Sequence, residues 1–255
     1  MTKTYRWGIV VPVYNHGAAL ENVVKQLLCY DVPIIVVDDG NDDANKAHIS
    51  RVAQNYNQVV LVTRAKNGGK GRAMNDGVRK AQELGLTHIL QIDSDGQHDA
   101  SRVERFLSIS QNNPKALVCG YPEYDKDAPK KRVNGRKVAN FFVMVVTLSK
   151  SIKDAMIGFR IYPVEPYCKC LNGHAILDGR MGYDIDILVH LSWAGVPVIS
   201  ESVKVSYPSD GISNFRIFFD NVRISLTYAR LCIGMFVRFP FLLGRNIKRL
   251  VNGGK

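Results

Sequence analysis

The stretch Arg6-Trp7-Gly8-Ile9-Val10-Val11-Pro12-Val13-Tyr14-Asn15 decides the fold. Its middle is a continuous apolar run that ends at a proline and two polar residues, which predicts a buried strand followed by a loop. Comparable apolar runs follow at residues 32–37, 59–63 and 88–92, and helical spacing covers residues 18–29 and 70–84. Because buried strands alternate with helices, we expect an α/β fold with a doubly wound, mostly parallel sheet.

Polar residues follow several of these strands. Tyr14-Asn15 ends the first, Asp38-Asp39-Gly40-Asn41 ends the second, and Asp93-Ser94-Asp95-Gly96-Gln97 follows residues 88–92. In open α/β sheets, ligands bind outside the carboxyl ends of the strands. We therefore expect the functional site at this edge of the sheet.

Composition excludes several classes of protein. The chain has 255 residues, of which 46% are hydrophobic and 22% charged, as in an ordinary globular protein. No run approaches the roughly 20 apolar residues of a membrane-spanning helix, and residues 1–6 lead into the first strand without a signal peptide. The five cysteines are scattered, which argues against a zinc site or a disulfide framework and fits a reducing cytosol.

The net charge of +11 is concentrated in two segments. Residues 126–137 carry six basic residues and one aspartate, and residues 216–255 carry eight basic residues and one aspartate. The rest of the chain is close to neutral. Two basic patches on a neutral body indicate an anionic partner, which could be a phosphate, a membrane surface or a nucleic acid.

The second half of the chain has a less regular pattern. We expect a helix near 138–150, a strand over 158–162, a helix near 184–194 and a pair of strands near 197–207. A long helix over 214–239 should end or kink at Pro240. These patterns predict a catalytic domain over residues 1–212 and a basic helical extension over 213–255, which either belongs to the same domain or forms a membrane-surface arm.

Asp93 and Asp95 are the first candidate metal ligands. Alternation along the strand places both carboxylates on one side, toward the expected cleft. Clustered carboxylate oxygens suit Mg²⁺ or Mn²⁺, with phosphate and water completing the coordination. The alternative for such a short motif is an acidic turn without a ligand.

Four motifs in order make the resemblance to a family specific. They are Val11-Pro12-Val13-Tyr14-Asn15, Ile35-Val36-Val37-Asp38-Asp39-Gly40, Asn67-Gly68-Gly69-Lys70-Gly71-Arg72-Ala73-Met74-Asn75, and Asp93-Ser94-Asp95-Gly96-Gln97-His98. From residue 7 to about residue 210 the chain resembles the family 2 glycosyltransferases of the GT-A fold. The resemblance implies a UDP- or GDP-sugar donor, a divalent cation (Mn²⁺ or Mg²⁺) and transfer with inversion.

The resemblance also assigns roles to individual residues. It implies that Asp39 contacts the nucleoside, that Asp93 and Asp95 hold the cation and that Gln97 is a weaker ligand. Asp95 would act in catalysis through that cation. The other residues expected to bind the nucleotide-sugar are Pro12, Val13, Tyr14, Asn15, Gly69, Lys70, Arg72, Asn75 and Ser94. The glycine loop at residues 67–72 opens a helix, so its N–H groups and basic side chains favour an anion; a loop with solvated bases is the alternative.

Asp184 and Asp186 are the candidates for a general base. A hydroxyl acceptor must lose its proton to a carboxylate, and Asp186 stands where many relatives have a glutamate. Residues two apart on a helix do not share a face, so we expect only one of the two to reach the cleft. Either could instead serve as favourable charge at a helix N-terminus.

The acceptor is suggested by a second, narrower resemblance. The basic residues Arg132 and Arg136, followed by Asp154-Ala155-Met156-Ile157-Gly158-Phe159-Arg160, resemble the dolichyl-phosphate mannosyltransferase branch. This implies a lipid-phosphate acceptor, which is already ionised and needs no strong base. Arg132, Arg136 and Arg160 could then clamp its phosphate; a solvated basic face is the alternative.

The C-terminal residues predict an amphipathic helix. Arg216, Arg223 and Arg230 are seven apart, and Arg238 and Arg245 continue the row, so they form one stripe beside many apolar residues. This composition is typical of an interfacial helix on anionic lipid; packing on the domain with the arginines in water is the alternative. The stretch at 206–215 resembles a glycosyltransferase subgroup of bacterial lipid and aryl-polyene pathways.

The sequence therefore favours an inverting glycosyltransferase acting on a lipid-linked acceptor, peripheral on the cytoplasmic face of the cell membrane. A soluble or polysaccharide hydroxyl acceptor is the first alternative. A sugar-1-phosphate nucleotidyltransferase would need a glycine-rich, arginine-containing loop after the first strand, where this chain has Pro12-Val13-Tyr14-Asn15. We expect no nucleic-acid partner, because the acidic strand ends would repel phosphates without a metal.

Overall fold

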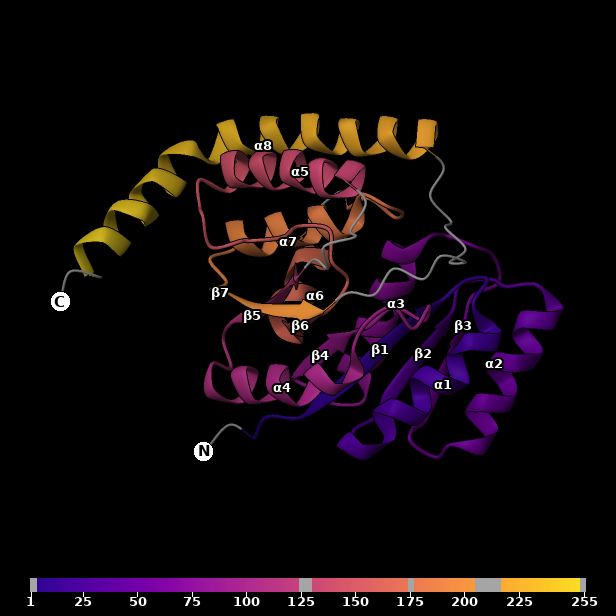
Figure 1. Ribbon diagram of the computed structural model, residues 1–255. Coiled ribbons are helices and arrows are strands. Elements are labelled where there is room, and N and C mark those ends of the chain that lie inside the picture. Colours follow the sequence, from indigo (N-terminus) through magenta and orange to yellow (C-terminus); the bar gives the residue numbers. More distant parts are fainter. Residues whose placement is uncertain (1–3, 124–129, 174–176, 205–216, 253–255) are drawn as a thin grey trace.

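A seven-stranded sheet runs through the protein, with helices on both faces (Figure 1). The computed structural model describes residues 4–123, 130–173, 177–204 and 217–252. The strands are β1 (Trp7–Val13), β2 (Ile34–Asp38), β3 (Val59–Thr63), β4 (His88–Gln91), β5 (Leu117–Glu123), β6 (Arg160–Pro163) and β7 (Val198–Lys204). Their order in the sheet is β3-β2-β1-β4-β6-β5-β7.

The sheet is mostly parallel, which confirms the predicted fold class. β3, β2, β1 and β4 pair in parallel, and so do β5 and β7; β6 runs antiparallel to both of its neighbours. The register pairs Val13 with Asp38 and Val10 with Gln91. The carboxyl ends of β1, β2 and β4 therefore lie at one edge of the sheet.

Helices cover the two faces as separate layers. Those within the main part of the chain are α1 (Gly17–Leu27), α2 (Asp43–Asn55), α3 (Lys70–Glu83), α4 (Val103–Asn112), α5 (Lys130–Thr147), α6 (Val164–Asn172) and α7 (Tyr183–Trp193), with short 3-10 turns at Leu28–Tyr30 and Ala100–Arg102. Apolar residues of α1, α2 and α4 pack on one face of the sheet. Those of α3, α6 and α7 pack on the other, where α5 and α8 form a further layer (Figure 1).

Most predicted elements are confirmed to within a few residues, and the differences have local causes. Helix α5 begins at Lys130, eight residues before the expected start, because its first turns are basic rather than apolar. Helices α2, α4 and α6 and strand β5 were not predicted. Helix α2 buries only Ile49 and Val52, so its apolar periodicity is weak.

Helix α8 (Ile217–Asn252) has 36 residues and continues through Pro240. Figure 1 shows that it bends in its C-terminal part, in agreement with a kink rather than an end. Within the described residues, the segment 219–248 is long and apolar enough to cross a membrane by length and composition. This corrects the expectation that no segment approaches that length: arginines interrupt the apolar run in the sequence, but helical geometry leaves them on one flank.

Four arginines of α8, namely Arg223, Arg230, Arg238 and Arg245, contact the domain, whereas many of the helix's apolar side chains are exposed. Leu231, Met235 and Leu242 join the core beneath the helix. The outer face carries exposed apolar side chains, namely Phe219, Val222, Leu226, Ile233, Phe236, Val237, Phe239, Phe241, Leu243 and Ile247. On the neighbouring α5, Val138, Phe141 and Phe142 are also exposed. The helix thus packs on the domain, as the alternative interpretation expected, yet keeps a long apolar face uncovered.

Candidate functional site

Asp39, at the carboxyl end of β2, organises the glycine loop at residues 67–72. Its buried carboxylate accepts hydrogen bonds from the backbone N–H groups of Gly68 and Gly69 at 2.9 and 2.8 Å, and from the Asn67 amide at 3.0 Å. The Arg64 guanidinium lies 2.9 Å from the same carboxylate. Three hydrogen-bond donors and one cation therefore converge on Asp39, and the loop is tied to the strand end.

The glycine loop uses its own backbone donors for the fold. Beyond the two bonds to Asp39, the N–H groups of Gly71 and Arg72 donate to the carbonyl of Gly179 at 3.0 and 3.4 Å. Gly69 has φ +92°, and a Cβ there would lie 2.5 Å from the Gly179 oxygen, so only glycine fits. These N–H groups do not face an open anion site as expected, because Asp39 and Gly179 occupy them.

Lys70 joins two carboxylates from distant parts of the chain. Its Nζ lies 2.8 Å from Asp93 Oδ1, after β4, and 3.0 Å from Asp184 Oδ2, in the first turn of α7. The His98 ring approaches Asp93 Oδ2 at 3.4 Å. The structure thus brings together three predicted site residues, which we call the Lys70 cluster: Lys70, Asp93 and Asp184.

The electrostatics of the Lys70 cluster favour the charged forms of Asp93 and Lys70. Burial alone would raise the pKa of Asp93, but the Lys70 ammonium and a hydrogen bond from His98 outweigh it and hold that pKa well below its usual range. Burial would lower the pKa of Lys70, but Asp184 and Asp93 raise it above its usual value. Lys70 and Asp93 therefore form an ion pair, and the Asp184 carboxylate contacts the same ammonium.

Gly158 lets the backbone before β6 come close to this cluster. A Cβ at Gly158 would lie 2.6 Å from Lys70 Nζ and 2.7 Å from Asp93 Oδ2. Contacts that short require something to shift, so a side chain at this position would disturb the ion pair.

Residues of β4 and β6 also hold Asp184 in position. Gln91, the last residue of β4, donates from Nε2 to Asp184 Oδ1 at 3.0 Å, and Tyr162 donates to Gln91 at 3.1 Å. Arg160 donates to the backbone carbonyls of Asp184 at 2.5 Å and Ala155 at 2.8 Å. Arg160 is fully buried, so here it supports the start of α7 rather than facing an acceptor phosphate as expected.

Asp186 points away from the Lys70 cluster. Its side chain is fully buried, where it pairs with Arg230 of α8 and accepts the Asp178 N–H at 2.6 Å. The His190 ring lies 3.3 Å from its other oxygen. Only one of the two helix acids reaches the strand ends, as predicted, and it is Asp184; Asp186 lies among residues that hold helices together.

The remaining predicted residues divide between the site and the fold. Tyr14 and Asn15 are exposed at the end of β1, next to half-buried Pro12, whereas Val13 is buried and its carbonyl accepts the Asp39 N–H at 3.0 Å. Ser94 is buried beside Asp93.

Arg72, at the end of the glycine loop, is exposed. The side chain of Asn75 instead accepts a hydrogen bond from Tyr167 of α6 at 3.0 Å.

The basic helix α5 contacts the segment with which it was grouped. Arg136 pairs with the buried Asp154 at 2.7 Å, and Asp154 also accepts the N–H groups of Met156 and Ile157. Arg132 lies in α5, and its side chain is outside the described residues. Arg136 therefore anchors α5 to the turn that precedes Gly158.

The acidic turn offers the oxygen ligands that a divalent cation needs. Asp95 Oδ1 accepts the Gln97 N–H at 3.0 Å across a turn in which Gly96 has φ +73°. Within the described residues, no three Asp, Glu, His or Cys side chains gather as a ready-made metal site. Two carboxylates completed by diphosphate oxygens are, however, a common Mg²⁺ arrangement, so Asp93 and Asp95 fit such an ion; Gln97 is half-buried beside them.

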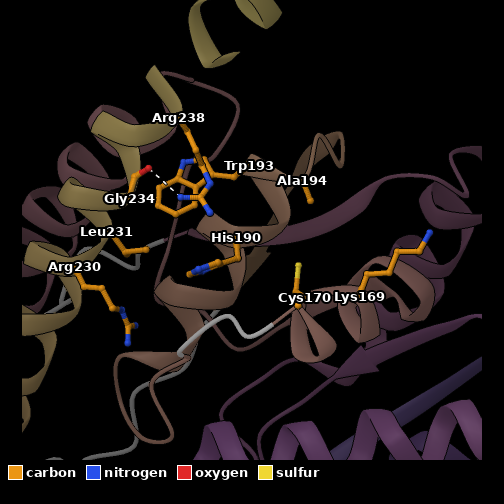
Figure 2. A pocket seen from close by; sticks show the side chains of 10 residues that line it. Lys169, Cys170, His190, Trp193, Ala194, Arg230, Leu231, Gly234 and Arg238 are labelled. Atoms are coloured by element: carbon orange, nitrogen blue, oxygen red, sulfur yellow. Dashed lines mark hydrogen bonds between the residues drawn. The ribbon is translucent and has the colours of Figure 1, made fainter. Parts of the chain in front are cut away.

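A separate cavity of about 480 Å³ lies at the other end of α7 (Figure 2). Figure 2 shows Arg238 beside Trp193, with its guanidinium bonded to the Gly234 carbonyl; the guanidinium lies 4.7 Å from the ring centroid. The residues that line the cavity come from α6, α7 and α8 and include the basic side chains of Lys169, Arg230 and Arg238. This cavity contains none of the predicted site residues.

Several residues of the site were not predicted. They are Arg64, Gln91, His98, Asp178 and Gly179. A polar Gln91 inside the apolar run at 88–92 was a usable signal, because a buried amide needs partners. The roles of Asp178 and Gly179 depend on tertiary contacts that local patterns do not encode.

Comparison with known proteins agrees with this geometry. The family model described as glycosyl transferase family 2 matches residues 8–170. A human dolichyl-phosphate beta-glucosyltransferase is 25% identical over 223 residues, which cover 79% of this chain and 67% of that protein. A UDP-N-acetylglucosamine–dolichyl-phosphate N-acetylglucosaminyltransferase from Methanococcus voltae is 26% identical over 171 residues, covering 60% of this chain and 68% of that one.

Solved structures show the same fold. Glucosyl-3-phosphoglycerate synthase from Mycobacterium tuberculosis, solved with Mn²⁺ and UDP-glucose, superimposes with a TM-score of 0.64 at 15% identity, covering 91% of this chain and 79% of that one. A mannosyltransferase from Pyrobaculum calidifontis, solved with GDP-mannose and Mn²⁺, gives a TM-score of 0.57 at 16% identity over 98% of this chain and 76% of that one. The GT-A fold expected from the sequence is confirmed.

Proposed function

We propose, from the premise that this chain belongs to glycosyl transferase family 2, that it transfers a sugar from a nucleotide-diphosphate-sugar to a polyprenyl-type lipid phosphate. That the chain is a glycosyltransferase enzyme follows from the family. The observation that carries the proposal is the Lys70 cluster, in which Lys70 bridges Asp93 and Asp184 at the carboxyl ends of the strands. The acceptor is inferred from relatives whose names specify dolichyl phosphate.

The donor would bind across the ends of β1, β2 and β4. Tyr14 and Asn15, which are exposed at the end of β1, would contact the nucleoside, and Asp39 would act by fixing the glycine loop beside it. Arg72 and Lys70 supply positive charge near the diphosphate. Lys70 offsets one of the two negative charges of Asp93 and Asp184, so a divalent cation would be needed to offset the rest before the donor's phosphates approach.

Asp95 and Asp93 would hold a divalent cation together with the diphosphate. Such a cation supplies charge neutralisation for the departing nucleotide. Asp93 would have to share its oxygens with Lys70, so binding of donor and cation would move the Lys70 ammonium toward Asp184 or toward the phosphates.

The acceptor chemistry determines whether a base is needed. A lipid phosphate is ionised at neutral pH and attacks the sugar from the face opposite the nucleotide, which inverts the configuration. Asp184, held by Lys70 and Gln91, then positions neighbouring groups rather than taking a proton. A soluble or polysaccharide hydroxyl acceptor would instead require Asp184 as general base.

We also propose that the enzyme works peripherally, on the cytoplasmic face of a membrane, in the synthesis of a cell-envelope lipid. The support is the exposed apolar face of α8 with its neighbours on α5. A helix with a wide apolar face lies in the plane of the interface. Because α8 packs along α5 and α7 over several turns, an in-plane position keeps these contacts, whereas crossing the membrane would break them.

A two-part experiment tests the proposal. Thermal shifts with UDP-glucose, UDP-N-acetylglucosamine and GDP-mannose, each with Mn²⁺ or EDTA, should show one nucleotide stabilising the protein only with the metal. Labelled donor should then transfer its sugar to undecaprenyl phosphate in mixed micelles but not to undecaprenol. Transfer to undecaprenol alone would overturn the phosphate acceptor.

Variants identify the residues involved. Asp95→Ala should abolish both the metal-dependent shift and the transfer, whereas Asp43→Asn, an exposed change on α2, should leave both unchanged. Asp184→Asn should keep both donor binding and transfer to undecaprenyl phosphate. Loss of transfer to a hydroxyl acceptor alone would favour Asp184 as the general base of a hydroxyl mechanism. Near-normal turnover by Asp95→Ala would show that Asp95 does not act in the site.

A further inference from the structure

We infer that α8 is a positioning support for the glycine loop, so that contact of its outer face with a bilayer strengthens donor binding. The inference rests on the proposed function for its membrane part only. It starts from the segment at residues 177–182, here called the support segment, which lies between the glycine loop and α8.

Three residues of α8 hold the support segment and the start of α7. Thr227 donates a hydrogen bond to Asp178 Oδ2 at 3.3 Å, Arg223 lies 3.8 Å from the same oxygen, and Arg230 pairs with Asp186. Positions 223, 227 and 230 are spaced by four and three residues, so they share one face of the helix. Asp186 in turn accepts the Asp178 N–H at 2.6 Å.

The support segment is in turn hydrogen-bonded to the glycine loop. The Gly179 carbonyl accepts the N–H groups of Gly71 and Arg72. Cβ atoms built at Gly69 and Gly71 would lie 2.5 Å from the carbonyl oxygens of Gly179 and Asp178, so the two segments are in close backbone contact. A movement of the support segment therefore moves the start of α3, and with it Lys70.

The adjacent face of the same helical turns is apolar and exposed. Val222, Leu226 and Ile233 are exposed, and each lies within four residues of an α8 residue that holds the support segment. A bilayer bound to this face would hold α8 against the domain. Since α8 and the glycine loop are joined by contiguous hydrogen bonds, that restraint lowers the entropy lost when the loop orders around a donor.

Two near-isosteric variants test the support. Thr227→Val removes only the hydroxyl that reaches Asp178, and Thr227→Ser keeps it. Loss of one such hydrogen bond should raise amide hydrogen exchange at Gly71 and Arg72 about three- to tenfold. The donor's Kd should rise by a similar factor with little change in kcat, and Thr227→Ser should restore both values.

The matched control is Arg238→Gln. Arg238 lies on the same helix but contacts Trp193 and Gly234, not the support segment. It should leave exchange at Gly71 and Arg72 unchanged. If Thr227→Val raised exchange there no more than Arg238→Gln does, the support role would be overturned.

Vesicles test the membrane part. Phosphatidylcholine vesicles with 20% phosphatidylglycerol should slow exchange at Gly71 and Arg72 in the wild-type protein and lower the donor's Kd. Vesicles that bind without either effect would overturn the coupling. If vesicles do not bind, the coupling and the proposed membrane location both fail, while the exchange data for Thr227→Val still decide whether α8 supports the loop.

Discussion

Asp39 at the end of β2 accepts a hydrogen bond of 2.8 Å from the backbone N–H of Gly69, the residue that precedes the first turn of α3. A strand end and a helix start that lie 30 residues apart are thereby fixed to each other. The sequence suggested Asp39 as a nucleoside contact. In the structure its carboxylate holds the glycine loop in place. Gly68 and Asn67 also donate hydrogen bonds to it, and Arg64 forms an ion pair with it.

Asp39→Asn should therefore damage the loop without changing its size. Both oxygens of Asp39 accept hydrogen bonds, whereas an asparagine has one oxygen and one NH₂ group. The NH₂ group would face other donors, so at least one buried N–H of the loop would lose its acceptor. We expect a loss of about 1–3 kcal/mol in the free energy of unfolding, measured with urea, together with weaker binding of the nucleotide donor.

Asp42→Asn is the matched control for this change. Asp42 caps α2 by accepting the Asn45 N–H at 2.8 Å, and asparagine caps helices equally well. Its unfolding midpoint should stay near that of the wild type. An Asp39→Asn protein as stable as this control would show that the loop does not depend on the carboxylate.

Local patterns predicted the parts of the structure that are local. The apolar runs predicted β1 to β4, and the polar residues that follow β4 pointed to Asp93. Lys70 and Asp184, which the structure places beside it, were suggested by the glycine loop and by the family resemblance. What could not be predicted is the pairing of side chains far apart in sequence. Asp186 and Arg230, for example, are joined by the way α8 packs, and no periodicity in either segment indicates the other.

Lys70→Met should convert the Lys70 cluster into a stronger metal site. Removing the ammonium leaves Asp93 and Asp184 without their shared partner, and we expect a loss of about 1–3 kcal/mol of stability because the side chains are only partly exposed. Mn²⁺ should then raise the melting temperature of Lys70→Met more than that of the wild type, since two carboxylates become free to bind it.

Differential scanning fluorimetry with Mn²⁺ and with EDTA checks this expectation. Lys80→Met, on an exposed turn of the same helix where Lys80 pairs with Glu83, is the matched control and should show no added response to Mn²⁺. Equal shifts for wild type and Lys70→Met would mean that Lys70 does not compete with the cation.

The Lys70 cluster also predicts how stability depends on pH. The pKa of Asp93 is below its usual range in the folded state, so its contribution is present above about pH 4 and is lost as the pH falls further. The pKa of Lys70 is raised, so its contribution persists up to about pH 10 and is lost above that. The groups facing Asp93 are Lys70 and His98, and Asp184 faces Lys70 from α7.

Urea unfolding in EDTA at pH 3, 4, 5 and 7 measures the acid side of this profile. Wild type should lose stability between pH 5 and pH 3, and Lys70→Met should lose less, because the ammonium that lowers the pKa of Asp93 is gone. Parallel pH profiles for the two proteins would contradict the assignment of Lys70 as the main stabilising partner.

Gly158→Ala tests the close approach of the backbone to the Lys70 cluster. The added methyl would lie 2.6 Å from Lys70 Nζ and 2.7 Å from Asp93 Oδ2, so one of the two must move. We expect a loss of about 1–3 kcal/mol from overpacking and weaker donor binding, even though no charged group is removed. Gly244→Ala is the control: it has open space and lies inside α8, where alanine stabilises by up to about 1 kcal/mol.

The apolar face of α8 should be required for membrane binding but not for folding. Ile233 and Phe236 are 67% and 71% exposed, so the double change Ile233→Ser and Phe236→Ser removes little buried area and should leave the melting temperature nearly unchanged. Co-sedimentation with phosphatidylcholine vesicles should fall at least tenfold, since each apolar side chain contributes about 1.5–3 kcal/mol when fully buried. Transfer to undecaprenyl phosphate in vesicles should fall with it, whereas donor binding in solution should persist.

The paired change Gln54→Ser and Gln111→Ser, at exposed sites on α2 and α4, is the control and should preserve vesicle binding. If it reduced vesicle binding as much as the α8 change does, α8 would not be the membrane-facing element.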